Sequence, residues 1–355
     1  MAASQLTSGV SMELLSTHQG VEILQQVQST VVEASPARVD AIRELLEEEV
    51  EFVEKALRDA AAEGEAPGTL AARHLVVAGG QRIRPMALLL SAACFGDIPP
   101  AARELAVVVE MVHAATLLHD DVIDDGDTRR GVPTARRLYG NAVSVLAGDL
   151  MLTHALDRTA RHAVDVLPDL LVTLRRLVDG EVIQLRGRTS LDLSEATYNR
   201  ILLDKTASLF GWATGAGARV AGAGAKDVEH LVAFGELLGT AFQLVDDALD
   251  YEGDGRRMGK PLLADLREGK VTLPLALTAL HTPSLLADVA LVRAGNDEVI
   301  EEISRKVRAS GACAEVRRRA SVATARARTC LSKLTPSAAR ELLDVVTIQL
   351  TGRGA

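Results

Sequence analysis

Aromatic residues are scarce in this chain of 355 residues: they make up 3% of the sequence, with one Trp, three Tyr and five Phe. Strands are enriched in aromatic residues, whereas Ala, Leu, Arg and Glu, which are abundant here, favour helices. The composition therefore predicts a helical protein. Because 48% of the residues are hydrophobic, the chain can bury a sizeable core, in one large domain or two smaller ones.

Cysteine is also rare, and the three cysteines, Cys94, Cys313 and Cys330, lie far apart in the sequence. This spacing excludes the usual zinc motifs, and three cysteines do not make a disulfide framework. The N-terminus lacks a basic region followed by an apolar one, so we expect no signal peptide. These observations fit a protein of the reducing cytoplasm.

Long hydrophobic runs are absent as well. The most apolar stretch, residues 105–118, is interrupted by Glu110 and His113 and is too short to cross a bilayer. The formal net charge of −9 argues against nucleic acid as a partner. We therefore expect a soluble protein without a transmembrane segment.

Helical periodicity begins near residue 35, after an N-terminal tail (1–34) that is rich in Ser, Thr and Gln. We predict one all-α domain over residues 35–355, a single large helical bundle with no convincing strand. The segment between residues 251 and 271 predicts a polar loop, placed like an active-site lid. The expected helices are 37–62, one ending near 77, 85–95, one from 100 through the first acidic cluster, 141–162, 166–187, 194–221, 226–251, 271–281, 286–293, 297–309, 311–332 and 336–350.

Two acidic clusters with the pattern D-D-x-x-D end two apolar stretches: Asp120-Asp121-Val122-Ile123-Asp124 and Asp246-Asp247-Ala248-Leu249-Asp250. On a helix, positions i and i+4 share one face, so the first and last aspartates of each cluster repel each other. Mg²⁺ relieves such repulsion, and when it is bound by few carboxylates it keeps positions for phosphate oxygens. One cluster alone would most simply be a solvated helix end. Two copies, each followed by basic residues, favour a metal site.

The basic residues are placed around these clusters. Arg recognises phosphate bidentately, whereas Lys acts as a movable point charge. A site with so many cations and carboxylates suits a polyanion that is bridged by metal, and diphosphate fits that description. His113 by itself would be interpreted as a buried, hydrogen-bonded histidine. The basic residues are Arg82, Arg84, Arg129, Arg130, Lys205, Lys260 and Lys270.

Several segments together resemble the trans-isoprenyl diphosphate synthases, in the order and approximate spacing of that family. The resemblance extends roughly from residue 35 to the C-terminus. It implies an isoprenoid-synthase bundle around a central cavity, a homodimer, and head-to-tail condensation of isopentenyl diphosphate with an allylic prenyl diphosphate. The segments are Gly79-Gly80-Gln81-Arg82-Ile83-Arg84-Pro85, His119-Asp120-Asp121-Val122-Ile123-Asp124, Arg129-Arg130-Gly131, Lys205-Thr206 and Phe242-Gln243-Leu244-Val245-Asp246-Asp247 with Asp250.

The resemblance also implies a set of metal ligands, with three Mg²⁺ ions expected when substrate is bound. Asp120 and Asp124 would bind two ions on the allylic diphosphate, with Asp121 in support. Asp246 would bind the third ion, with the two other aspartates of its cluster, Asp247 and Asp250, in its outer shell or on water.

Further residues are assigned to the two substrates by the same resemblance. The backbone carbonyls of Lys205 and Thr206 and the amide oxygen of Gln243 would face the allylic cation. The allylic diphosphate would be bound by Arg129, Lys205 and Lys260. Isopentenyl diphosphate would be bound by Arg84, His113 and Arg130, together with Gln81.

The sequence departs from the family at two positions. Gln81 stands where the family usually has Lys, which keeps a donor but removes a charge, and a charge-assisted hydrogen bond is roughly twice as strong as a neutral one. We therefore expect weaker binding of isopentenyl diphosphate without loss of activity. Leu263 stands where the family often has Gly.

Product length is predicted from the helix below the first acidic cluster. Ala115 and Thr116, the fifth and fourth residues before Asp120, are both small, whereas short-chain members commonly have an aromatic residue at one of these positions. Deeper on the same face lie Met111 or Val112 and then Val108, about 18 Å from Asp120 along the helix. This open path predicts a hexaprenyl to decaprenyl product, best octaprenyl, for quinone side chains, with release at a membrane surface.

Three alternatives stay open at this point. The chain could be a short-chain synthase that makes farnesyl or geranylgeranyl diphosphate. A terpene cyclase or head-to-head synthase would share the helical fold, but it usually lacks the second D-D-x-x-D and the Gly-Gly-x-Arg-x-Arg segment. A non-catalytic subunit of a heteromeric synthase typically loses carboxylates of one cluster, and this chain keeps both.

Overall fold

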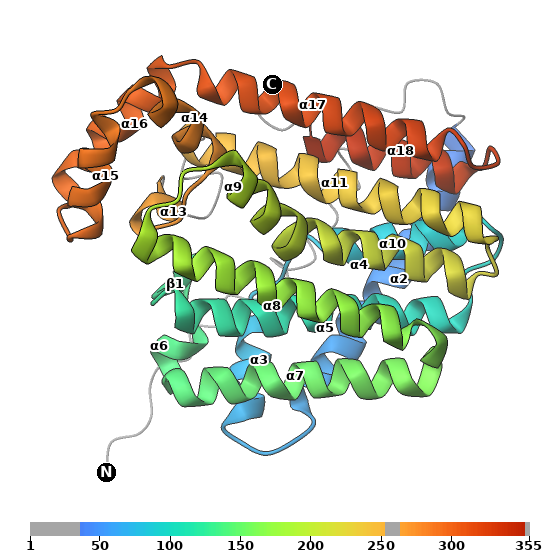
Figure 1. Cartoon of the computed structure of the whole chain (residues 1–355). Coiled ribbons are helices and arrows are strands. Elements are labelled where there is room, and N and C mark those ends of the chain that lie inside the picture. The colour runs from blue at the N-terminus through green and yellow to red at the C-terminus, as the bar shows by residue number, and fades with distance from the viewer. Residues whose placement is uncertain (1–35, 253–262, 352–355) are drawn as a thin grey trace, which may run out of the picture.

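The structure, a computed structural model, describes residues 36–252 and 263–351, and these residues are almost entirely helical. Figure 1 shows the helices arranged as a bundle of long, roughly aligned rods. The all-α fold class is therefore confirmed. The α-helices are α2 (Pro36–Ala62), α3 (Gly68–Val77), α4 (Ile83–Ala93), α5 (Pro100–Ile123), α6 (Ala135–Tyr139), α7 (Asn141–His162), α8 (Leu167–Ser190), α9 (Glu195–Ile201), α10 (Ser208–Val220), α11 (Ala225–Glu252), α13 (Ala264–Arg267), α14 (Leu273–His281), α15 (Leu285–Arg293), α16 (Ile300–Ala309), α17 (Ala312–Leu331) and α18 (Ala338–Thr351).

Two helices carry the acidic clusters, and both are packed inside the bundle. Helix α5 packs against α4 and α7, and α11 packs against α10 and α17 (Figure 1). Leu105, Val109 and Leu118 of α5 are fully buried in one hydrophobic cluster, and Val245 and Ala248 of α11 are buried in another. Each acidic cluster is therefore held on a rigid helix with a packed apolar base.

The helix expected over residues 194–221 is not continuous. It consists of α9, a π-helical turn η2 (Leu202–Ala207) and α10. A π-turn inserts an extra residue into the helix and is common at functional sites. Propensity and hydrophobic spacing do not reveal such a turn, because it depends on contacts with neighbouring helices. Single 3₁₀ turns, η1 (Val164–Val166) and η3 (Asp297–Val299), precede α8 and α16.

The expectation of no strand was wrong in one small detail. Strands β1 (Thr128–Arg129) and β2 (Val132–Pro133) form an antiparallel pair directly after the first acidic cluster. The two residues of the turn, Arg130 and Gly131, have φ values of 53° and 78°. Positive φ at both central residues is the pattern of the tightest hairpin turns. Two paired residues per strand are too few for an alternating sequence pattern.

By length and composition, α11 alone among the described helices is apolar enough to cross a membrane. Half of that apolar window, 50%, is buried inside the protein.

Candidate active site

The first acidic cluster lies at the C-terminal end of α5. Asp120 and Asp121 belong to the last turn, and the N–H of Asp124 donates to the Asp120 carbonyl at 2.8 Å. The C-terminal end of a helix carries partial negative charge, so carboxylates there need cations nearby. Asp121 is buried, and its carboxylate accepts from Arg129 Nε and Nη2 at 2.9 and 2.8 Å. Burial raises the pKa of Asp121, and Arg129 opposes that rise.

Two lysines bind the outer aspartates of this cluster. Lys205 Nζ lies 3.4 Å from Asp120 Oδ2 and also pairs with Glu181. Lys270 Nζ lies 2.8 Å from Asp124 Oδ2 and 2.5 Å from Glu268 Oε2. Burial lowers the pKa of Lys270, but the surrounding carboxylates outweigh it and the pKa is raised overall.

The second acidic cluster lies near the end of α11, with Asp247 and Asp250 buried and Asp246 half-buried. Burial lowers the pKa of Arg84 overall, although Asp246 is close enough to stabilise the charge of this arginine. Both oxygens of Asp247 accept hydrogen bonds from within the protein. Burial raises the pKa of Asp247 to about 7, with a further contribution from the charge of Asp265.

The π-turn η2 places Lys205 and Thr206 between the two clusters. Thr206 Oγ1 donates to Gln243 Oε1 at 3.1 Å, which links the turn to α11. Gly180 of α8 lies directly against the turn, because a Cβ at this position would come within 2.9 Å of Lys205 N. Asp204 in the same turn is buried and accepts from Arg176 of α8 at 2.9 Å.

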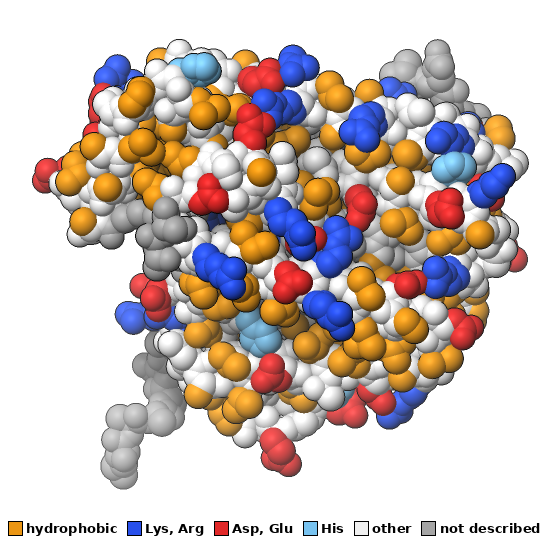
Figure 2. All heavy atoms as spheres, in the orientation of Figure 1, with side chains coloured by type: hydrophobic (Ala, Val, Ile, Leu, Met, Phe, Trp, Pro, Cys, Tyr) orange, Lys and Arg blue, Asp and Glu red, His pale blue; other side chains and the backbone are white. Residues whose placement is uncertain are grey.

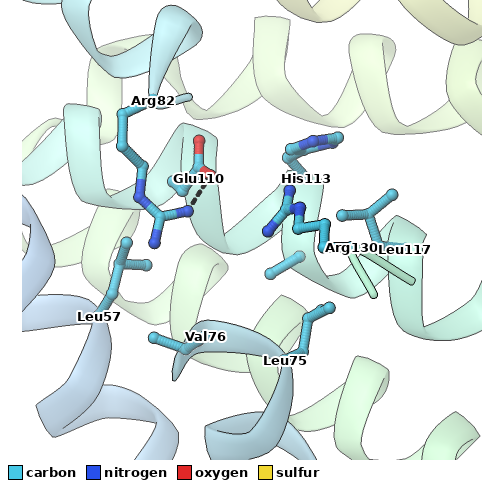
Figure 3. Close-up of a pocket in the computed structure, with 9 residues that line it drawn as sticks. Leu57, Leu75, Val76, Arg82, Glu110, His113, Leu117 and Arg130 are labelled. Atoms are coloured by element: carbon cyan, nitrogen blue, oxygen red, sulfur yellow. Dashed lines mark hydrogen bonds and ion pairs between the residues drawn. The ribbon is translucent and has the colours of Figure 1, made fainter. Parts of the chain in front are cut away.

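A separate pocket next to these clusters combines basic and apolar groups. Figure 3 shows Arg82, His113 and Arg130 around Glu110, with Leu57, Val76 and Leu75 below them and Leu117 beside Arg130. Gly80 approaches the basic groups closely, because a Cβ here would lie 2.7 Å from Arg82 Nη1. Burial and the nearby Arg84 and Arg130 charges hold the pKa of His113 well below 6.5. A neutral histidine among arginines is suited to an anion that brings negative charge.

Glu110 of this pocket was missed by the functional prediction, and Arg82 was counted among the basic residues without a substrate assigned to it. Arg82 donates from Nε to Glu54 and from Nη1 to Glu110, both at 2.5 Å. Burial lowers the pKa of Arg82, but the two carboxylates outweigh it and raise the pKa well above the usual value. A signal was present in the sequence, because Glu110 interrupts the apolar stretch one turn before His113.

The other predicted residues for isopentenyl diphosphate lie beside this pocket. The guanidinium carbon of Arg84 stacks over the Phe210 ring, 4.6 Å from its centroid. Gln81 is exposed and follows the Gly79-Gly80 pair that leads into α4.

The residues assigned to product length lie on α5 as expected. Ala115 is 2% exposed, and Val108, Met111 and Val112 are fully buried in the same hydrophobic cluster. Thr116 is half-buried, and its hydroxyl donates to the His113 carbonyl at 2.8 Å.

Leu263 begins the described chain after the second cluster, with φ of 63°. This left-handed conformation suits glycine and costs a leucine about 1 kcal/mol. The Leu263 side chain is 5% exposed and belongs to the hydrophobic cluster under α11, while its N–H donates to the Asp250 carbonyl at 3.2 Å. Packing therefore offsets the backbone strain. Lys260 lies outside the described residues.

Within the described residues, no three His, Cys, Asp or Glu side chains form a closed metal cage. Mg²⁺ does not require one, because it is typically bound by one or two carboxylates together with substrate phosphates and water. Asp120 and Asp124 already attract cationic groups, and lysine ammonium groups lie against their oxygens. The donor set therefore fits Mg²⁺ that binds together with a diphosphate.

A model of the polyprenyl synthetase family matches residues 69–307. The chain belongs to the polyprenyl synthetase family. Over 275 residues it is 38% identical to the octaprenyl diphosphate synthase of Escherichia coli (strain K12). This alignment covers 76% of this chain and 85% of that protein. It is 37% identical over 275 residues to the all-trans-nonaprenyl-diphosphate synthase (geranyl-diphosphate specific) of Rhodobacter capsulatus, which covers 76% of this chain and 84% of that protein.

Solved structures of the family have the same fold. A polyprenyl synthase from Caulobacter crescentus CB15, complexed with calcium and isoprenyl diphosphate, aligns with a TM-score of 0.83 and 33% identity. The alignment covers 89% of this chain and 98% of that one. This member of the polyprenyl synthetase family is therefore a prenyltransferase with the isoprenoid-synthase fold.

Proposed function

We propose that this chain is a Mg²⁺-dependent head-to-tail prenyltransferase that makes a long all-trans polyprenyl diphosphate. The observation that carries the proposal is the pairing of two carboxylate clusters with a separate basic pocket. One region suits a metal-bridged diphosphate and the other suits a diphosphate held by arginines. Two adjacent diphosphate sites are what condensation of two prenyl diphosphates requires.

The carboxylate region would bind the allylic substrate. Asp120, Asp124 and Asp246 are the proposed Mg²⁺ ligands, with Asp121 and Asp250 in support and three ions in all. When bound, Mg²⁺ stabilises the negative charge of a departing diphosphate. Arg129, Lys205 and Lys260 would add cationic contacts to the same group.

The carbon skeleton would react between the two regions. The allylic C–O bond breaks, and its electron pair leaves with the diphosphate. The carbonyl oxygens of Lys205 and Thr206 and the amide oxygen of Gln243 would stabilise the allylic cation. The double bond of isopentenyl diphosphate then attacks the cation, and the proton that is lost goes to the departing diphosphate. Holding both substrates in register supplies much of the remaining rate enhancement.

The basic pocket would bind isopentenyl diphosphate. His113 and Arg130 line it, and Arg84 and Gln81 lie in the segment that follows the Gly79-Gly80 pair. Bound diphosphate would supply the negative charge that the arginines attract and would favour protonation of His113. The assignment of Gln81 to this substrate rests on the family pattern.

The proposed product is octaprenyl diphosphate or a similar long chain for quinone side chains. Ala115 is small, and the deeper positions assigned to the same face, Met111, Val112 and Val108, carry only aliphatic and thioether side chains. The names of two relatives, an octaprenyl and a nonaprenyl synthase, support the same range. A product of this length favours release at a membrane surface, from an enzyme that works in the cytoplasm.

A homodimer is proposed through the outer face of α7 and α8. Large apolar side chains are exposed there, including Leu146 at 63%, Val172 at 56% and Val178 at 62%. Figure 2 shows hydrophobic side chains spread over this face. Light scattering should give twice the chain mass of 37.7 kDa, and Leu146→Asp combined with Val178→Asp should give the monomer mass.

The deciding experiment is an assay of the purified chain alone with Mg²⁺, farnesyl diphosphate and labelled isopentenyl diphosphate. Chromatography of the dephosphorylated products should show a long polyprenol, and EDTA should abolish its formation. A product of three or four isoprene units would identify a short-chain synthase. No turnover unless a second chain is added would identify a subunit of a heteromeric enzyme.

A further inference from the structure

The amide of Gln243 lies between two groups of opposite hydrogen-bonding character. Its Oε1 accepts from Thr206 Oγ1 at 3.1 Å, and its Nε2 donates to Asp247 Oδ1 at 2.9 Å. In the proposed reaction the Gln243 oxygen faces a developing carbocation. The orientation of this amide therefore matters, because rotation by half a turn would place two N–H groups where an oxygen is needed.

Two further groups donate hydrogen bonds to Asp247, and both come from outside α11. Tyr198 Oη of α9 donates to Asp247 Oδ2 at 2.7 Å, and the N–H of Leu273, the first residue of α14, donates to the same oxygen at 3.3 Å. The carboxylate is 3% exposed, and Tyr198 is 7% exposed. All three partners of Asp247 are donors, so its carboxylate acts as an acceptor toward each of them.

This arrangement leaves one favourable orientation for the Gln243 amide. If the amide were flipped, Oε1 would face the Asp247 oxygen and a buried acceptor would lose its donor. An unsatisfied buried acceptor typically disfavours such an orientation by about 5- to 150-fold. The three donors to Asp247 come from three different helices, since Tyr198, Gln243 and Leu273 belong to α9, α11 and α14.

We propose that Asp247 is a positioning residue that fixes the Gln243 amide with its oxygen toward Thr206 and the reacting centre, and that it is not a ligand of Mg²⁺. The inference rests on the proposed prenyltransferase activity, and it replaces the outer-shell metal role that the family resemblance implies for this aspartate. Within the second cluster, the metal-binding role then belongs to Asp246, and Asp247 faces inward.

The test compares Asp247→Asn with Asp246→Asn in the full-length enzyme. In Asp247→Asn the two donors that reach Oδ2, Tyr198 Oη and the Leu273 N–H, would keep the new amide oxygen on their side, so its NH2 group would face Gln243 and favour the flipped glutamine amide. We expect kcat to fall about 10- to 100-fold, within the range by which an unsatisfied buried acceptor disfavours one amide orientation. The KM for each substrate should stay within about twofold of the wild-type value, and so should the Mg²⁺ concentration that gives half-maximal activity. In Asp246→Asn the required Mg²⁺ concentration should rise.

A double mutant separates an indirect role from a direct one. If Asp247 acts through Gln243, then adding Asp247→Asn to Gln243→Ala should lower kcat by less than about twofold further. Tyr198→Phe keeps the ring and removes one donor to Asp247, so it should lower kcat in the same direction by a smaller factor. It also serves if Asp247→Asn does not fold.

A binding measurement gives a readout besides turnover. Calorimetric titration with Mg²⁺ and a non-reacting thio analogue of the allylic diphosphate should give equal Mg²⁺ affinity for wild type and Asp247→Asn. Weakened Mg²⁺ binding in Asp247→Asn, or multiplicative losses in the double mutant, would overturn the inference while leaving the proposed activity standing. Wild-type enzyme without turnover would overturn both.

Discussion

Replacing Glu110 with Gln should lower the stability of the substrate-free protein. The same change should make the Tm respond more strongly to added diphosphate. The Glu110 carboxylate is 4% exposed and accepts from Arg82 Nη1 at 2.5 Å. Its charge also acts on Arg84 and Arg130, so one buried carboxylate balances several arginines. Glu110→Gln keeps the shape and an acceptor oxygen but removes that charge.

The size of the effect follows from the remaining contacts of Arg82. Removing one partner of a buried ion pair typically costs about 3–5 kcal/mol. Because Glu54 still binds Arg82 Nε, we expect the lower end of this range, about 3 kcal/mol. For a chain of this length, that corresponds to a fall in Tm of roughly 4 °C.

The assay is thermal unfolding in EDTA, with and without inorganic diphosphate. Diphosphate should raise the Tm of Glu110→Gln more than that of wild type, because the anion supplies the missing negative charge. Glu49→Gln is the matched control: Glu49 is 2% exposed and binds Arg103, whose side chain is 44% exposed. It should lower the Tm without any added response to diphosphate. An equal diphosphate response in Glu110→Gln and wild type would refute the reasoning.

Three further changes test separate parts of the site. Ala115→Phe should shorten the product, because an aromatic ring would fill the path along α5; an unchanged chain length on chromatography would remove this residue from the path. Gln81→Lys should lower the KM for isopentenyl diphosphate about fivefold by adding a charged donor, whereas an unchanged KM would separate this position from the substrate. His113 has a pKa held well below 6.5, chiefly by burial and the nearby arginines, so below that pH the unfolded chain binds more protons. Wild-type stability should therefore fall on acidification from about pH 7.5 to about pH 5.5 in urea titrations, and His113→Asn should show a smaller fall.

Local signals in the sequence predicted the helical elements well. The bounds of α7 match the expected 141–162, and those of α11 differ from the expected 226–251 by one residue at each end. Hydrophobic spacing and Gly or Pro breaks act within a few residues, so they can be read from the chain directly. The π-turn η2 and the β1–β2 hairpin were missed, since each involves few residues and the π-turn depends on contact with α8.

The sequence by itself determined the family, the all-α class and the two D-D-x-x-D clusters, because their spacing on a helix is a local property. Only the tertiary structure decided what each aspartate contacts. Asp120 forms an ion pair with Lys205, and Asp124 forms one with Lys270. Asp247 instead accepts a hydrogen bond from the buried Tyr198. These partners lie tens to more than a hundred positions away in the chain and become neighbours when buried charges and donors must be satisfied together. The same D-D-x-x-D pattern therefore contains carboxylates suited to metal and a carboxylate that orients Gln243.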